Sequence, residues 1–220
     1  MTLSTLRALD GPRLAPVSGR ATGLVVLLHG YGANGDDLIA LAHGWRQRLP
    51  GAAFVAPNAP EAVPGLVGAR QWFALTLQDP SEYWRGVVAA APALDRFIAA
   101  ELARLDVAAE RLVLVGFSQG TMLALHVALR RAVAPAAVVA YSGLLAGPEH
   151  LGEIKTRPPV LLVHGEADDL IPVEALHLAR EPLAGAGLAV EWHVRPGLAH
   201  GIDAAGERLG VSFIAQAFKA

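Results

Sequence analysis

Cysteine is absent from the 220 residues of the sequence. This absence excludes disulfide bonds, metal sites built on thiolates and a cysteine nucleophile. A chain without cysteine also fits a reducing compartment, so we expect a cytoplasmic protein.

Long hydrophobic runs are missing as well. The strand-like apolar runs, such as Leu24–Leu28, are far shorter than the roughly twenty apolar residues that a membrane-spanning helix needs. The first residues, MTLSTLRALDGPRLAP, lack the basic and then apolar order of a signal peptide. We therefore expect no integral membrane segment.

Charge is scarce and mixed in sign. Charged residues make up 17% of the chain, and the net charge at pH 7 is −2. The basic residues are scattered, and Arg130-Arg131 is their only adjacent pair. Without a basic patch, the chain is not expected to bind nucleic acid.

Metal-ligand spacing is also lacking among the histidines outside the motifs described below. The sequence places no carboxylate at metal-ligand spacing from any of these histidines, which are His43, His150, His177 and His193. We expect no metal site.

Hydrophobic residues make up 53% of the chain, which is typical of a compact folded protein. Short apolar runs alternate with helical patterns, and this alternation predicts a mostly parallel central sheet with helices on both faces. The expected strands are Leu24–Leu28, Ala53–Ala56, Leu112–Val115, Ala136–Tyr141, Pro159–Val163 and Leu188–Val194. The first expected helix has Asp36 or Asp37 as its N-cap and continues to about Arg48. The others span Ser81–Leu105 with a kink or an irregular turn at Pro92, follow Gly120, and span Val173–Ala186 and Gly201–Phe218. No domain boundary is visible, so residues 1–220 are expected to form a single domain.

The strand at Leu112–Val115 leads into GFSQG at 116–120 and then into an Ala- and Leu-rich helical pattern. A G-x-S-x-G sequence between a strand and a helix is typical of a nucleophile elbow, which exposes the serine hydroxyl at a helix N-terminus. Ser118 is therefore a candidate nucleophile. The alternative is a small residue in a tight turn.

A serine nucleophile needs a base and an acid to hold that base. HGEADDLIP at 164–172 and GLAHG at 197–201 each follow a predicted strand, so both loops should meet Ser118 at one edge of the sheet. His200 lies in the second loop and is the candidate base. Asp168 and Asp169 are adjacent carboxylates in the first loop, and spacing alone leaves both open as the acid.

Several motifs occur in a fixed order over about residues 22–202: LLHGYGANGDD, PNAP, RQWF, GFSQG, HGEADDLIP and GLAHG. In these motifs the chain resembles the phospholipase/carboxylesterase family of α/β-hydrolases, small serine esterases related to acyl-protein thioesterases. The resemblance implies an α/β-hydrolase fold without a cap domain, and no cofactor.

The resemblance also implies residue roles. Ser118 would be the nucleophile, Asp168 the acid and His200 the base, with an oxyanion hole made by the backbone N–H groups of Tyr31 and Gln119. Relatives often have proline where this chain has Asp169, so Asp169 stays the alternative acid. On the irregular loop 57–80, Trp72 and Phe73 are expected to form a wall of the acyl pocket; the alternative is that they fill the core.

The expected activity is hydrolysis of carboxylic esters with short to medium acyl chains through an acyl-enzyme. The same triad would serve an acyl thioesterase or a lysophospholipase, and a non-catalytic binding protein is the remote alternative. The connection between Tyr141 and Pro159 is too short for a cap domain, which favours an open groove. The expected partner is a small-molecule or lipid-like ester, and an apolar rim leaves a homodimer open.

Overall fold

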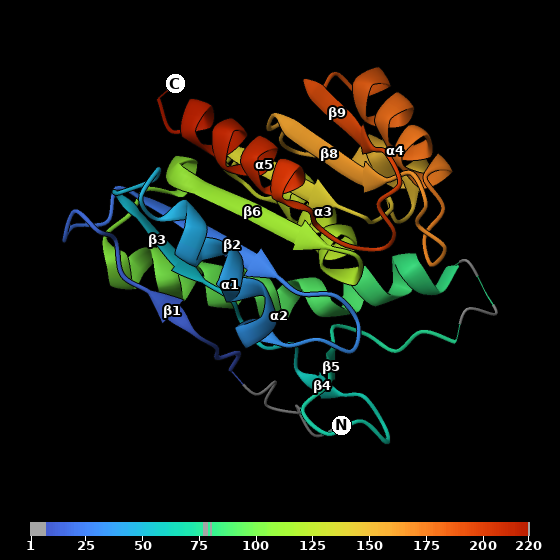
Figure 1. The fold of residues 1–220 in the computed structure, drawn as a ribbon, viewed down its shortest axis with the longest axis horizontal. Coiled ribbons are helices and arrows are strands. Elements are labelled where there is room, and N and C mark those ends of the chain that lie inside the picture. The colour runs from blue at the N-terminus through green and yellow to red at the C-terminus, as the bar shows by residue number, and fades with distance from the viewer. Residues whose placement is uncertain (1–7, 77–78, 80, 220) are drawn as a thin grey trace.

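A seven-stranded sheet forms the centre of the protein (Figure 1). The computed structural model describes residues 8–76, 79 and 81–219. The strand order is β1-β3-β2-β6-β7-β8-β9, and every neighbouring pair is parallel except β1 with β3. The strands are β1 (Arg13–Leu14), β2 (Gly23–Leu28), β3 (Ala52–Val55), β6 (Leu112–Phe117), β7 (Ala137–Tyr141), β8 (Val160–Gly165) and β9 (Val190–Arg195). This confirms the mostly parallel sheet.

Helices cover both faces of the sheet, as expected. They are α1 (Gly35–Trp45), α2 (Ser81–Leu105), α3 (Gln119–Arg130), α4 (Glu174–Gly185) and α5 (Ala204–Ala217). The core on one face contains residues of α2, α3 and α4, and the core on the other contains residues of α1 and α5. Side chains along each central strand alternate between the two cores: Leu112 and Leu114 lie in the first, Val113 and Val115 in the second.

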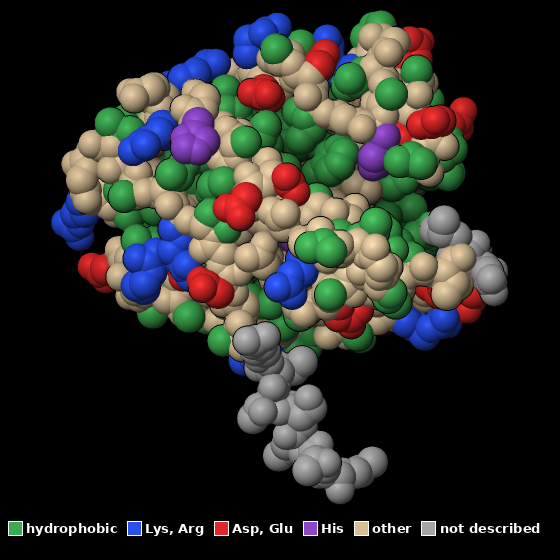
Figure 2. Space-filling model, turned by 60° about the horizontal axis from the view of Figure 1, so that its bottom comes forward, with side chains coloured by type: hydrophobic (Ala, Val, Ile, Leu, Met, Phe, Trp, Pro, Cys, Tyr) green, Lys and Arg blue, Asp and Glu red, His purple; other side chains and the backbone are tan. Residues whose placement is uncertain are grey.

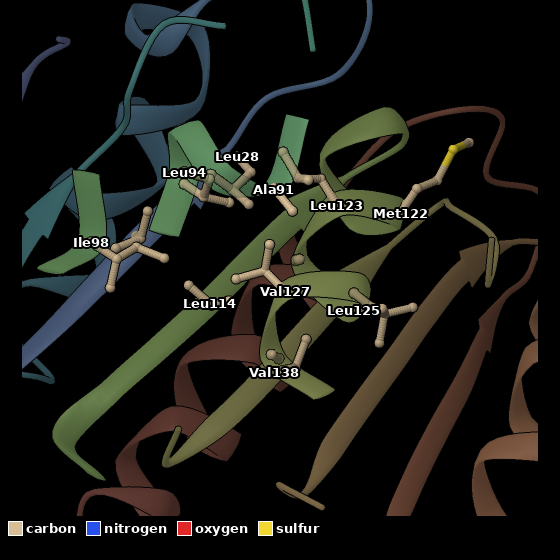
Figure 3. Packing of buried hydrophobic residues seen from close by; sticks show 14 of the residues in the cluster. Leu28, Ala91, Leu94, Ile98, Leu114, Met122, Leu123, Leu125, Val127 and Val138 are labelled. Carbon is tan, nitrogen blue, oxygen red and sulfur yellow. The ribbon is translucent and has the colours of Figure 1, made fainter. Parts of the chain in front are cut away.

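The first core is built where α2 and α3 pack onto the middle of the sheet (Figure 3). Leu94 and Ile98 of α2 meet Leu123 and Val127 of α3 above Leu114 of β6, and all five side chains are fully buried or nearly so. This packing fixes the position of α3, and with it the position of Ser118 at the start of that helix.

The first helix begins two or three residues earlier than predicted, because its N-cap is Asn34 and not Asp36 or Asp37. The Asn34 side chain accepts hydrogen bonds from the N–H groups of Asp36 and Asp37, and the Asp37 carboxylate accepts one from the Asn34 N–H. This reciprocal capping box satisfies N–H groups that a helix otherwise leaves free. Helix α2 continues through Pro92 to Leu105.

The irregular loop 57–80 contains a short hairpin that the sequence did not predict, β4 (Glu61–Ala62) with β5 (Arg70–Gln71). Residues 77, 78 and 80 of this loop lie outside the described residues. The connection from β7 to β8 contains only one short 3₁₀-helix, η2 (Pro148–Glu153), so it holds no cap domain. Among the described helices, none combines the length and the apolar character needed to cross a bilayer.

Candidate active site

Ser118 lies in a sharp turn between β6 and α3. Its backbone dihedrals, φ 54° and ψ −117°, are rare for a residue with a side chain, and such a conformation costs about 1–3 kcal/mol. The Ser118 N–H donates to the Tyr141 carbonyl at 3.0 Å, and its own carbonyl accepts from the Thr121 N–H at 2.9 Å. At position 120 a Cβ atom would lie 1.9 Å from the Leu28 carbonyl oxygen, so this turn requires glycine. The predicted strand–turn–helix context is therefore present.

His200 is held by a carboxylate. Its Nδ1 atom lies 2.7 Å from Oδ2 of Asp168, whose side chain is fully buried. Oδ1 of Asp168 accepts hydrogen bonds from the N–H groups of Leu170 at 3.1 Å and Ile171 at 2.9 Å. Burial alone would raise the pKa of Asp168, but these bonds and the one from His200 outweigh it and lower the pKa. Asp169 is exposed.

Ser118 and His200 line the same cavity, which has a volume of about 350 Å³. The Phe117 ring packs against the His200 ring with 4.9 Å between centroids, which limits how the imidazole can move. Between Ser118 and His200 the structure has no hydrogen bond. Contacts of this kind are often long without substrate and tighten in the reacting complex.

The backbone N–H groups of Tyr31 and Gln119 donate to none of the described residues. Gln119 is the first residue of α3, where a helix leaves N–H groups unpaired and the helix dipole favours negative charge. Both residues line the cavity beside Ser118. These N–H groups are therefore available for an oxyanion.

Trp72 and Phe73 lie in the core and do not line this cavity; their exposed fractions are 2% and 5%. The Gln119 side chain forms hydrogen bonds with the backbone of both residues, since Oε1 accepts from the Trp72 N–H at 2.9 Å and Nε2 donates to the Phe73 carbonyl at 2.8 Å. The Trp72 indole in turn donates to the His29 carbonyl at 2.9 Å. These bonds tie the loop that carries the Tyr31 N–H to the start of α3.

The apolar side of the cavity comes from residues that the sequence did not single out as lining a site. They are Leu75, Tyr83, Met122, Leu170 and Ile171. Helical spacing offered a signal for one of them, because Met122 lies one turn after Ser118 on α3. Leu170 and Ile171 directly follow the acid loop. Leu75 and Tyr83 carry no such signal, because tertiary packing alone brings them here.

Other residues near the site have structural partners. His29 donates from Nδ1 to the Gly30 carbonyl at 2.8 Å and accepts the Ala59 N–H at Nε2 at 3.0 Å, so it stabilises the turn after β2. The Ser142 hydroxyl donates to the Gly201 carbonyl, next to His200, at 3.3 Å. Asp203 is the N-cap of α5. In the described part of the chain, no group of three or more histidine and carboxylate side chains is arranged to hold a metal ion.

Comparison with known proteins adds independent information about the family of this chain. The phospholipase/carboxylesterase family model matches residues 10–216. Among curated proteins, acyl-protein thioesterase 1 of Gibberella zeae is 26% identical over 207 residues, which cover 86% of this chain and 88% of that protein. Acyl-protein thioesterase 1 of Saccharomyces cerevisiae is 30% identical over 179 residues, covering 75% of this chain and 78% of that protein.

Solved structures agree with this result. Esterase PE8 is 41% identical and superposes with a TM-score of 0.91, covering 94% of this chain and 98% of that one. A phospholipase/carboxylesterase from Dyadobacter fermentans is 26% identical with a TM-score of 0.76, covering 97% and 99%. The fold is that of the α/β-hydrolases. The chain therefore belongs to the phospholipase/carboxylesterase family, and it is a hydrolase of this esterase and thioesterase group.

Proposed function

We propose that the protein is a serine carboxylesterase that cleaves esters of short to medium acyl chains through an acyl-enzyme. One observation carries the proposal: His200, held by buried Asp168 at 2.7 Å, shares one largely apolar cavity with Ser118. A base, the acid that orients it and a strained serine meet there beside two unpaired N–H groups. Such a set fits nucleophilic acyl transfer.

Each group has a step in this mechanism. Asp168 accepts the Nδ1 proton of His200, so the Nε2 lone pair is free to take the Ser118 proton as Oγ attacks the acyl carbonyl. The N–H groups of Tyr31 and Gln119 stabilise the resulting oxyanion, and each such donor contributes about 3 kcal/mol to lowering the barrier. His200 then protonates the leaving oxygen, and later activates the water that releases the acid.

The size of the cavity favours acyl chains of short to medium length. Its apolar side, formed by Leu75, Tyr83 and Met122, lies within a space of about 350 Å³, at the small end of ligand pockets. A longer chain would have to leave this space and lie on the surface.

The charge of the site favours neutral esters over lysophospholipids and acyl-CoA thioesters. Among the described residues, neither Lys nor Arg lines the cavity beside Ser118. A phosphate group would therefore find no cation to pair with. The face drawn in Figure 2 carries acidic and basic side chains interspersed with hydrophobic ones, with no continuous basic field.

The test is kcat/KM for p-nitrophenyl esters from acetyl to palmitoyl, with a parallel series of acyl-CoA thioesters. We expect short and medium esters to react fastest, and Ser118→Ala to lower kcat about a million-fold, as loss of a serine nucleophile does. Ser212→Ala on α5, which removes a hydrogen bond from Arg48, serves as the control. Faster reaction of thioesters or palmitoyl esters would contradict the substrate class, and an active Ser118→Ala would contradict the mechanism.

A further inference from the structure

A second cavity of about 270 Å³ adjoins the one beside Ser118. Gly30, Ala33 and Phe117 line both cavities, so the two spaces meet next to the nucleophile. The rest of the second cavity is formed by the residue that follows β2, by α1 and by the segment after His200. These residues are His29, Asp37, Leu38, Leu41 and Ile202.

The two cavities lie toward opposite faces of the sheet. Leu75, Tyr83 and Ile171 of the first pack against the core under α2, α3 and α4. Leu41 and Ile202 of the second pack against the core under α1 and α5. Ser118 directly follows β6 and lines the first cavity, whereas Gly30 and Phe117 line both. An acyl carbon bonded to Ser118 Oγ would thus lie in the first cavity, with the second cavity beyond Gly30 and Phe117.

The position of His200 decides which part of an ester each space receives. His200 must deliver its proton to the leaving oxygen, so the group on that oxygen extends past the imidazole. Ile202, two residues beyond His200, and Phe117, whose ring packs on His200, both line the second cavity. We propose that the second cavity binds the alcohol part of the ester, while the first binds the acyl part. This inference deepens the proposed esterase function and rests on it.

The lining of this alcohol site selects neutral, apolar alcohols such as alkyl and phenylalkyl groups. Within the described part of the chain no Lys or Arg lines it, and its carboxylate, Asp37, already accepts the Asn34 N–H at 2.9 Å. Burial lowers the pKa of His29, which favours a neutral ring in this wall. A leaving group that carries phosphate would therefore meet a carboxylate and no cation.

An alcohol in this site can also react with the acyl-enzyme, because that reaction is the reverse of the first step with a new alcohol. The hydroxyl proton passes to His200 while the alcohol oxygen bonds to the acyl carbonyl carbon. The bond from that carbon to Ser118 Oγ then breaks, and Oγ takes the proton from His200. The products are a new ester and free enzyme. The ratio of new ester to free acid thus measures how well the alcohol is bound.

The experiment keeps the acyl group constant and varies the alcohol. For butanoate esters of methanol, butanol, hexanol and 2-phenylethanol, kcat/KM is measured for the wild type, Leu41→Trp and Met122→Phe. We expect Leu41→Trp to lower the hexyl-to-methyl ratio about tenfold or more, because the indole fills the alcohol site. Its relative rates along the p-nitrophenyl acyl series should keep their order. Met122→Phe should shift that acyl series and keep the hexyl-to-methyl ratio.

A second variant at the same position keeps the test valid if Leu41→Trp does not fold. Leu41→Ala enlarges the alcohol site and should raise the hexyl-to-methyl ratio, as well as the yield of hexyl butanoate when hexanol competes with water. If both Leu41 variants leave these ratios as in the wild type, or change the acyl series instead, the assignment is wrong. If the wild type hydrolyses none of these esters, the proposed function itself fails, and the alcohol site with it.

Discussion

At the scale of single residues, two neighbouring aspartates have the same side chain but differ in burial and in hydrogen bonding. Asp168 is buried and accepts hydrogen bonds from His200 and from the Leu170 and Ile171 N–H groups, whereas Asp169 is exposed. Adjacent residues of an extended loop point in opposite directions, so only one of the pair can reach the histidine. The loop hydrogen bonds select Asp168.

Asp168→Asn is predicted to lower kcat about ten-thousand-fold with little change in KM. An asparagine can donate to Nδ1 and stabilise the wrong imidazole tautomer, and the same change in a serine protease triad has an effect of about that size. The measurement is steady-state kinetics on p-nitrophenyl butanoate. Asp169→Asn is the matched control and should stay within about twofold of wild type. A larger loss for Asp169→Asn than for Asp168→Asn would reverse the assignment.

At the scale of elements, the contact between α2 and loop 57–80 depends on Gly86. A Cβ atom built there would lie 2.2 Å from the Phe73 ring. Glycine at this position therefore lets α2 and the loop come this close to each other. Phe73 and its neighbour Trp72 are in turn bonded to the Gln119 side chain. Helix α2, this loop and the start of α3 therefore form one connected unit.

Gly86→Ala is predicted to lower the free energy of unfolding by about 1–2 kcal/mol. Alanine favours the helix by about 0.5–1 kcal/mol, but forcing a methyl group into the Phe73 ring costs about 1–3 kcal/mol. Gly44→Ala on α1 is the control, because its Cβ meets nothing closer than Glu207 Oε2 at 4.0 Å; it should stabilise by about 0.5–1 kcal/mol. Urea unfolding measures both, and a stabilised Gly86→Ala would refute the contact.

The elements themselves were largely predictable from sequence. Continuous apolar runs located the central strands, and α2 was predicted with its observed bounds, Ser81–Leu105. The β4–β5 hairpin was missed because a two-residue ladder has no alternating pattern to detect. The N-cap of α1 was missed because Asn34, Asp36 and Asp37 are all good capping residues, and only the backbone at Asn34 is extended.

At the scale of the whole molecule, the site is assembled from distant segments. The chain order of the motifs predicted which loops meet Ser118, because parallel strands end at one edge. It did not predict the walls of the two cavities. Leu41, Leu75 and Tyr83 reach the site only through the packing of α1, α2 and loop 57–80 on the sheet. Hydrophobic side chains of this kind look alike in sequence whether they fill a core or border a cavity.

Acid stability is also a property of the whole fold, and two buried histidines, His126 and His29, lower it below neutral pH, because burial lowers the pKa of each. His126 on α3 packs edge-on against the Trp84 ring, with 5.1 Å between centroids, and its Nδ1 atom has no hydrogen-bond partner among the described residues. Burial, and then the nearby charge of Arg130, lowers its pKa from 6.5 to about 4. The folded protein therefore holds His126 neutral where the unfolded chain protonates it.

His126 alone is accordingly predicted to lower the free energy of unfolding by about 3 kcal/mol as the pH drops from 6.5 to about 4, because only the unfolded chain binds the His126 proton in that range. Urea unfolding measured every half unit from pH 4 to 8 gives the slope of the free energy of unfolding against pH, and His126→Gln should make this slope smaller.

Glu101 provides the control. Burial raises its pKa, but the bonds from Arg13 and Arg104 outweigh this and lower it, so its contribution is lost only below about pH 4.5. Glu101→Gln should therefore keep the slope between pH 5 and 6.5, and a His126→Gln protein that also keeps it would show that another group is responsible.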